Sequence, residues 1–130
     1  MWYSTHMDTI KKDHLQQCPI EAVMSVLGGK WKVVVIDQLL SNSVMRFSEL
    51  RRAMPGVTQK MLTQQLRELE QSGIVERKIY PVVPPKVEYR LTTKGKTLED
   101  LLVLMKQWGV DFINSDRAVE PLAMIQSKNA

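Results

Sequence analysis

Residues 48–72 read SELRRAMPGVTQKMLTQQLRELEQS, and this stretch decides the fold. Leu50 and Met54 lie at i, i+4 spacing on one face of a short helix, which Pro55-Gly56 ends. A second, longer helix is predicted over Thr58–Ser72. A short helix, a three-residue turn that contains glycine and a longer helix are typical of a helix-turn-helix.

Three helices and one strand are predicted on the N-terminal side of this stretch. A polar helix is expected over Met7–Gln17 and a short helix over Ile20–Leu27. The helix over Lys30–Ser41 is apolar on nearly all sides, so it should be the buried central helix. Met45–Phe47 is predicted to form a very short strand, and Ser48 to cap the helix that follows.

Two runs with alternating polarity follow the long helix, at Ile74–Tyr80 and Val87–Leu91. Val75 and Ile79 fall on one face of the first run, as expected for a strand. The prolines of residues 81–85 (PVVPP) cannot continue a strand ladder, so this segment should be the turn of a β-hairpin.

One long final helix is predicted, from Thr92 or Thr93 to about Ile113. Its apolar stripe is wider than a helix of one small domain requires. We interpret this stripe, together with residues 8–17, as a dimer interface; the alternative is packing against the domain's own core. The predicted interface residues are Leu15, Leu98, Leu101, Leu102, Met105, Trp108 and Phe112.

These elements predict a mainly α (α+β) fold, a winged helix-turn-helix with a two-stranded β-wing and terminal dimerisation helices. The domain is expected to span residues 8–115, with dimerisation helices over 8–17 and 93–113. A flexible lead-in over residues 1–7 precedes it, and a tail over 116–130 follows. A chain of 130 residues is long enough for one domain with a buried core.

The net charge of +4 is concentrated in the middle of the chain. Residues 58–97 carry eight Lys or Arg against four Asp or Glu, whereas residues 98–130 carry three against five. This asymmetry favours a polyanionic partner, although a solvated surface also carries such charge.

The sequence also favours a cytoplasmic location. The longest apolar run, Val33–Ile36, is too short to cross a bilayer. The N-terminus lacks the basic and then apolar pattern of a signal peptide. The single cysteine, Cys18, forms no internal disulfide framework and fits a reducing compartment.

The helix predicted over Thr58–Ser72 is amphipathic and has a polar outer face. Its core side should carry Met61, Leu62, Leu66 and Leu69. Its outer side should carry Lys60, Thr63, Gln64, Arg67 and Gln71, with Gln59 at the edge. Gln reads adenine, Lys and Arg read guanine, and Thr contacts a phosphate or a thymine methyl. A solvated amphipathic helix of no special function is the alternative.

Basic residues also lie on the predicted hairpin, as expected for a wing that touches the DNA backbone or minor groove. The alternative is an exposed hairpin that Lys and Pro protect against aggregation. The residues predicted to contact double-stranded DNA are Ser48, Thr58, Gln59, Lys60, Thr63, Gln64, Arg67, Arg77, Lys78, Lys86 and Arg90. A winged-helix protein-interaction module without sequence-specific DNA binding is the competing function.

No constellation in the sequence points to catalysis, a cofactor or a metal. His6 and His14 both lie in the N-terminal segment, without a second cysteine or clustered carboxylates at ligand spacing. Cys18 has two open interpretations: a redox or electrophile sensor, favoured by the nearby Lys11 and Lys12, or an inert cysteine.

Five motifs extend over residues 18–112: Cys-Pro-x-Glu, Gly-Gly-Lys-Trp, Arg-Phe-x-Glu-Leu-Arg-Arg, Leu-Thr-x-Gln-Leu-Arg-Glu-Leu-Glu and Pro-Pro-Lys-Val-Glu-Tyr. In this combination the chain closely resembles the HxlR-type helix-turn-helix regulators. The resemblance implies a MarR-like winged helix, a homodimer built from the N- and C-terminal helices, and a bacterial-type transcription factor acting at palindromic promoter sites.

The resemblance also bears on Cys18. Some relatives sense formaldehyde, quinones, aldehydes or oxidants through a cysteine at this place, and in some it pairs with a second cysteine of the partner chain. This sequence has no second cysteine, so that switch cannot operate. A bridge between the two Cys18 residues of a dimer, or a small-molecule adduct, remains open, and the effector is unknown.

Overall fold

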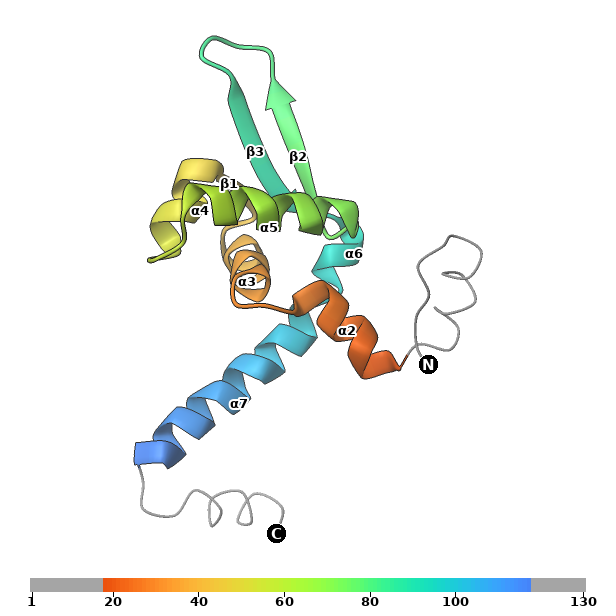
Figure 1. Ribbon diagram of the computed structural model, residues 1–130, viewed down its shortest axis with the longest axis vertical. Helices are drawn as coiled ribbons and strands as arrows, with labels where there is room; N and C mark the ends of the chain where they lie inside the picture. The colour runs from red at the N-terminus through yellow and green to blue at the C-terminus, as the bar shows by residue number, and fades with distance from the viewer. Residues whose placement is uncertain (1–17, 118–130) are drawn as a thin grey trace. The chain divides into compact units, whose positions relative to one another are not determined.

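The computed structural model describes residues 18–117. The chain forms two compact units, of which the first ends at Gly95 and the second begins at Lys96. The elements are α2 (Pro19–Leu27), α3 (Lys32–Asn42), β1 (Val44–Arg46), α4 (Phe47–Ala53), α5 (Gln59–Gln71), β2 (Val75–Tyr80), β3 (Lys86–Leu91), α6 (Thr93–Lys96) and α7 (Glu99–Arg117) (Figure 1).

The predicted helix-turn-helix is confirmed and consists of α4, a short turn and α5 (Figure 1). Gly56 has a φ of 92°, a left-handed conformation that favours glycine, which explains its place in the turn. The hydroxyl of Thr58 accepts a hydrogen bond from the N–H of Met61 at 3.1 Å and so caps α5. Ser72 is the C-cap, so the predicted bounds are the two cap residues, one residue outside the helix at each end.

The core of the first unit lies between α3, α4 and α5. Each helix contributes aliphatic side chains that are almost fully buried: Val35, Ile36, Leu39, Leu50, Met54, Leu62, Leu66 and Leu69. Burial of each such side chain stabilises the fold by about 1.5–3 kcal/mol. The prediction that α3 is the buried central helix is therefore confirmed, and α5 is fixed to the core along its leucine face.

The strands form one antiparallel sheet in the order β1-β3-β2, in which β1 comes before α4 in the chain and β2 and β3 come after α5. β2 pairs with β3 over its whole length, from Val75↔Leu91 to Tyr80↔Lys86, and the segment 81–85 turns between them as predicted. β1 adds a third strand beside the base of β3. The hairpin extends beyond α5 (Figure 1), and burial declines along it, since Val75 is buried whereas the side chain of Ile79 is 59% exposed.

Two local predictions about the helix-turn-helix are wrong. Ser48 does not cap α4, because the chain turns directly from β1 into the helix and Arg46 is the N-cap residue. The N–H of Arg46 donates to the carboxylate of Glu49 at 2.7 Å, which replaces a serine cap. Met61 is not in the core but 37% exposed, because the core contacts only the stripe formed by Leu62 and the leucines one and two turns later.

The single final helix is also wrong, since α6 and α7 are separated at residues 97–98 and α7 continues to Arg117. The start of α6 is held by Thr92, whose hydroxyl donates to the carbonyl of Gly73 at 2.6 Å and accepts from the N–H of Gly95 at 3.0 Å. Gly95 approaches the carbonyl of Ile74 so closely that a Cβ would not fit. These contacts fix the first turn of α6 against the segment that follows α5.

Several predicted segments lie outside the described residues. They are the lead-in over residues 1–7, the helix over Met7–Gln17 with Leu15, and most of the tail, of which residues 116–117 belong to α7. Among residues 18–117, no helix combines the length and the apolar character needed to span a membrane.

Candidate nucleic-acid interface

The outer face of α5 gathers the predicted DNA-contacting residues of this helix. Five side chains line one open surface hollow: Gln59, Lys60, Thr63, Gln64 and Arg67. Lys60, Gln64 and Arg67 lie opposite the buried leucine face, and Gln59 and Thr63 lie nearer its edge. The hydroxyl of Thr63 donates to the carbonyl of Gln59 at 2.8 Å, so its proton is engaged and its oxygen can still accept a hydrogen bond.

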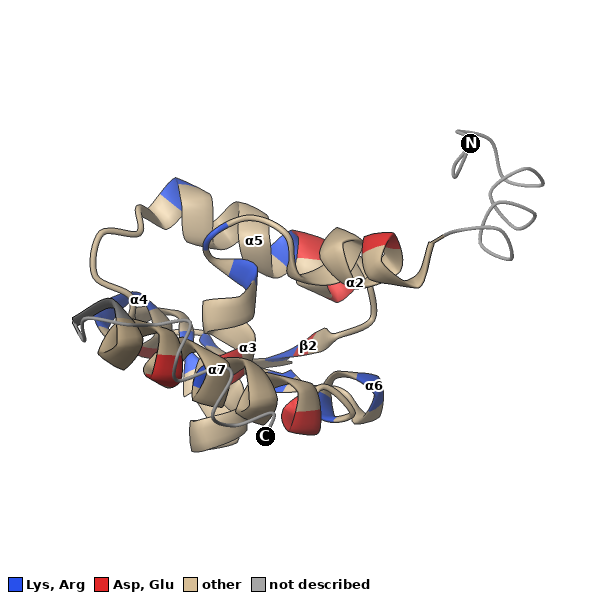
Figure 2. Ribbon diagram, turned by 90° about the horizontal axis from the view of Figure 1, so that it is seen from below, with Lys and Arg blue, Asp and Glu red and all other residues tan. Residues whose placement is uncertain are grey.

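The chemistry of this hollow suits a polyanion with polar edges. An ammonium, a guanidinium and two amides line it, and no carboxylate does. The carboxylates of α5, Glu68 and Glu70, lie toward its C-terminal end (Figure 2). Within residues 18–117, neither Lys60 nor Arg67 takes part in a salt bridge. Both cations are thus available to a ligand without the breaking of an ion pair.

Glu68 connects the outer face of α5 to α3. Its Oε1 lies 2.7 Å from Nζ of Lys32, and its Oε2 accepts a hydrogen bond of 2.6 Å from Nε2 of Gln64. The hydrogen bond from Gln64, and then the ammonium of Lys32, lower the pKa of Glu68 below its ordinary value, so it is ionised at neutral pH. The i, i+4 spacing of Gln64 and Glu68 predicts their hydrogen bond. The pairing with Lys32 could not be predicted in this way, because Lys32 lies far away in the sequence.

The junction of α5 and the hairpin contains a second ion pair. Nε of Arg77 lies 3.4 Å from Oε1 of Glu70, and Arg77 is opposite Tyr89 in the strand register. The side chain of Tyr89 is buried, and burial raises the pKa of its hydroxyl. The sequence assigned Arg77 to DNA, and in the free chain this residue connects β2 to α5.

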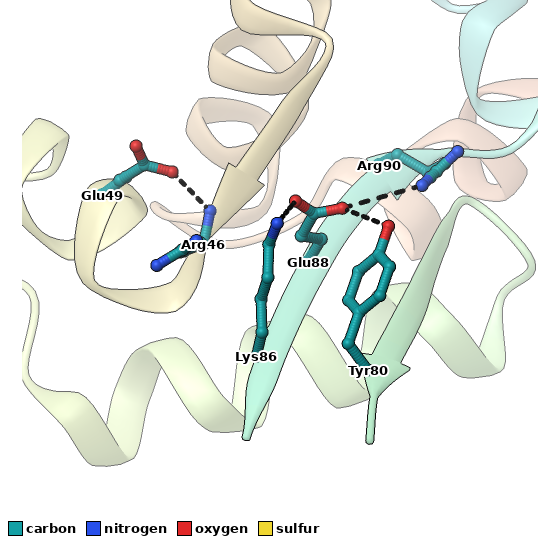
Figure 3. A network of polar contacts seen from close by, with 6 residues as sticks. All are labelled: Arg46, Glu49, Tyr80, Lys86, Glu88 and Arg90. Carbon is teal, nitrogen blue, oxygen red and sulfur yellow. Dashed lines mark hydrogen bonds and ion pairs between the residues drawn. The ribbon is translucent and has the colours of Figure 1, made fainter. Parts of the chain in front are cut away.

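The other three predicted wing cations lie on the opposite face of the sheet, around Glu88 (Figure 3). Nζ of Lys86 is 3.3 Å from Oε2 of Glu88, and Nη2 of Arg90 is 4.0 Å from Oε1. The hydroxyl of Tyr80 donates to the same Oε1 at 2.8 Å, and this bond is the main reason why the pKa of Glu88 is lowered.

Tyr80 also organises the lysines of this face. The ammonium groups of Lys78 and Lys86 each lie 4.9 Å from the centroid of its ring, within the range of a cation–π interaction. The sequence did not single out Tyr80 or Glu88. Both residues are two positions away from a basic residue on the same strand, and residues two apart on a strand share a face. This spacing is the feature of the sequence that could have identified them.

The turn of the wing is uncharged. Val82 and Val83 are exposed there, Val83 completely, and the basic residues lie on the strands rather than in the turn. The structure therefore brings the predicted residues of α5 together in one hollow, but divides the wing cations between the two faces of the hairpin.

The remaining described site residues lie in α7, directly before it and at the start of α2. In α7, Leu102 is buried and Leu101 is half-buried, whereas Met105, Trp108 and Phe112 are exposed; Leu98, directly before this helix, is half-buried. The rings of Trp108 and Phe112 stack with centroids 5.1 Å apart. Cys18 is half-buried as the N-cap residue of α2. In the described part of the chain, no three His, Cys, Asp or Glu residues form a group that suits a metal ion.

A short helix, a glycine turn, an exposed polar helix and an antiparallel hairpin define a winged helix-turn-helix protein. The family model of the HxlR-like helix-turn-helix matches residues 26–117. The chain belongs to the HxlR-like helix-turn-helix family, whose members found here are transcriptional regulators and not enzymes.

Three similar proteins support this assignment. The HTH-type transcriptional regulator YtcD of Bacillus subtilis is 52% identical over 95 residues, which cover 73% of this chain and 75% of the relative. The redox regulator HypR in its oxidised form has a TM-score of 0.67 and 52% identity, covering 71% of this chain and 94% of that chain. The reduced transcriptional regulator YodB from B. subtilis has a TM-score of 0.65 and 40% identity, covering 74% and 94%.

Proposed function

We propose that this transcriptional regulator is a homodimer that binds specific sequences in double-stranded DNA with α5 in the major groove. The observation that carries the proposal is the outer face of α5, where Lys60, Gln64 and Arg67 line one hollow that no carboxylate enters. A major groove admits an α-helix, and these residue types match the donor and acceptor patterns of base edges. The buried leucine face holds the helix rigidly for this role.

The wing is assigned a supporting role on the DNA backbone or in the minor groove. Lys78, Lys86 and Arg90 supply its positive charge. Contacts from such residues position a protein on DNA but carry little sequence information. We also propose a cytoplasmic location, since a bacterial-type regulator of this kind acts on the chromosome there.

Dimerisation is supported by the apolar surface of α7. Trp108 is 63% exposed, and further large apolar side chains of this helix are exposed with it, among them Leu104, Phe112 and Ile113. Exposed apolar surface of this kind marks interaction sites. In a dimer, two copies of α5 set about 34 Å apart would address successive major grooves of a palindromic site.

A salt titration tests the DNA-binding proposal against the protein-interaction module. We expect the affinity for duplex DNA to fall on the order of 10³-fold between low and moderate salt, because many phosphate contacts release counterions. The duplex is chosen by selection of bound fragments from a random pool. Affinity that does not respond to salt would exclude the DNA-binding function and favour a protein partner.

Cys18 gives a second proposal, a response to oxidants or electrophiles. It rests on the half-buried thiol at the start of α2 and on the similarity to a protein named as a redox regulator. Non-reducing electrophoresis after mild oxidant should reveal a linked dimer in the wild type and none in Cys18→Ser, and mass spectrometry should reveal any small adduct. An unmodified thiol after oxidant and aldehyde treatment would exclude sensing.

A further inference from the structure

Glu68 holds two partners with its two separate oxygens, and the partners come from different helices. Oε1 pairs with Lys32 of α3, whose side chain is 13% exposed, and Oε2 accepts from Gln64 of α5. The carboxylate is therefore held from the protein side by the ammonium of a half-buried lysine. Its other oxygen meets a residue of the surface hollow.

This arrangement determines which end of the Gln64 amide points toward Glu68. An ionised carboxylate only accepts hydrogen bonds, so the amide must present Nε2 to it. Reversal of the amide would bring Oε1 to the place of Nε2, 2.6 Å from a second acceptor. Such a contact would cost the hydrogen bond and add repulsion. The oxygen Oε1 and the second N–H of Gln64 stay available for a ligand in the hollow.

We propose that Glu68, anchored by Lys32, is a positioning residue that makes Gln64 present its carbonyl oxygen to the base edges of DNA. This inference rests on the proposed function. An oxygen in this position accepts from the N6 amino group of adenine or the N4 amino group of cytosine. With its second N–H, Gln64 also meets N7 of adenine, which makes adenine the better ligand. Guanine and thymine present acceptors at the equivalent place and are disfavoured.

The helix provides a matched control for the charge of Glu68. Glu70 is also a carboxylate of α5, but it pairs with Arg77 of β2 and makes no contact with Gln64. Removal of either carboxylate lowers the negative charge of α5 by one unit. An effect of charge alone would therefore appear in both variants, whereas an effect on the orientation of Gln64 would appear only when Glu68 is changed.

The test measures binding of the selected duplex and of the four bases at each position of its half-site. Gln64→Ala first identifies the base pair that Gln64 reads. At that base pair we expect Glu68→Ala to lower discrimination by about 3-fold to 10-fold, chiefly through better tolerance of guanine or thymine. Lys32→Met should give a smaller loss at the same base pair, and Glu70→Ala none. Circular dichroism checks that every variant keeps its fold.

A second readout uses the free protein. In nitrogen-15 NMR spectra, the two side-chain amide protons of Gln64 should have well-separated shifts in the wild type, because one of them is bonded to a carboxylate. In Glu68→Ala this separation should fall to that of a solvated glutamine, and in Glu70→Ala it should persist.

The positioning role would be overturned if Glu68→Ala left discrimination between bases unchanged, or lowered it at every base pair alike. The proposed function would still stand in that case, provided that the wild type binds its selected sequence specifically. A solvated Gln64 amide in the wild type would also overturn the role. A wild-type chain that binds every sequence alike would instead contradict the proposed function itself. The two failures are thus distinguishable.

Discussion

The outer face of α5 and the face of the wing that carries Glu88 have similar basic residues, but these residues differ in whether a carboxylate pairs with them. Lys60 and Arg67 on α5 form no salt bridge within residues 18–117, whereas Lys86 and Arg90 on the wing share the carboxylate of Glu88 (Figure 3). The same formal charge is therefore available to a ligand on the helix and already engaged on the wing. A count of basic residues along the sequence does not reveal this difference.

The difference also teaches how each region can contact DNA. Ion pairs at the surface contribute little stability, so a phosphate can replace Glu88 as the partner of Lys86. That exchange is compatible with contacts to the backbone, which carries many equivalent phosphates. The side chains of α5 are oriented by a buried leucine face and, for Gln64, by a hydrogen bond, which suits the reading of base edges.

The largest expected effect concerns the anchoring of the two regions. Leu66→Ala should destabilise the protein by about 2–5 kcal/mol, since Leu66 is buried in the core and its loss leaves a cavity. Ile79→Ala on the exposed part of the wing is the control and should change stability by about 0.5 kcal/mol or less. Urea denaturation measures both values. Equal losses would show that the wing is as firmly packed as α5.

Arg67→Ala should lower affinity for the selected duplex by about 1–3 kcal/mol, through a loss confined to one or two base pairs. The reason is that its guanidinium lies in the hollow of α5 and is not held by a carboxylate. Fluorescence anisotropy with single base-pair substitutions measures the effect. An equal loss on every sequence would assign Arg67 to a phosphate and remove the contrast with the wing.

Lys86→Ala should reduce the slope of log affinity against log salt by about one unit and weaken binding evenly across sequences. Its affinity loss should be smaller than that of Lys60→Ala, because Lys86 must first give up its pairing with Glu88 at 3.3 Å. The same salt titration on both variants makes the comparison. A slope unchanged from the wild type would mean that Lys86 does not reach DNA.

The smallest effect concerns acid stability. The pKa values of Glu68 and Glu88 are lowered in the folded chain from an ordinary value of 4.5. Each carboxylate therefore stabilises the fold at pH values above 4.5, and this contribution is lost as the pH falls through the lowered values. Thermal denaturation between neutral pH and about pH 3 should show a weaker pH dependence in Glu88→Gln than in the wild type. An identical dependence would contradict the lowered pKa of Glu88.

The elements that could be predicted from sequence are those with strong local signals. The Pro55-Gly56 turn, the helix start at Thr58 and the leucine spacing defined α4 and α5, and the prolines of residues 81–85 defined the hairpin turn. The break between α6 and α7 at residues 97–98 could not be predicted, because Thr97 and Leu98 supply no helix-breaking glycine or proline. The contacts of Thr92 and Gly95 with the segment after α5 join residues far apart in the sequence, and helical periodicity carries no information about them.

The site shows the same division. The outer face of α5 follows from helical periodicity, and the five α5 residues predicted to contact DNA do line one hollow, whereas Gln71, also predicted for this face, does not. Some of the partners could not be read from helical or strand spacing: Lys32, which pairs with Glu68, comes from α3, far away in the sequence. The bond from Tyr80 to Glu88 depends on the register of the hairpin, which the alternation of the strands alone does not fix. Ser48 shows the opposite error, a local signal that the structure does not use. Serine is a good capping residue, but β1 leads directly into α4, so the helix begins before Ser48 and Arg46 is its N-cap.

One measurement tests most directly whether α5 reads the DNA sequence while the wing supports binding. It is the ratio of the affinity for the selected duplex to that for random duplex at one fixed salt concentration. We predict that the combined change Gln64→Ala and Arg67→Ala lowers this ratio at least about 10-fold, whereas Lys86→Ala weakens both affinities and leaves the ratio unchanged. A ratio that survives the changes in α5, or that falls with Lys86→Ala instead, would contradict this assignment.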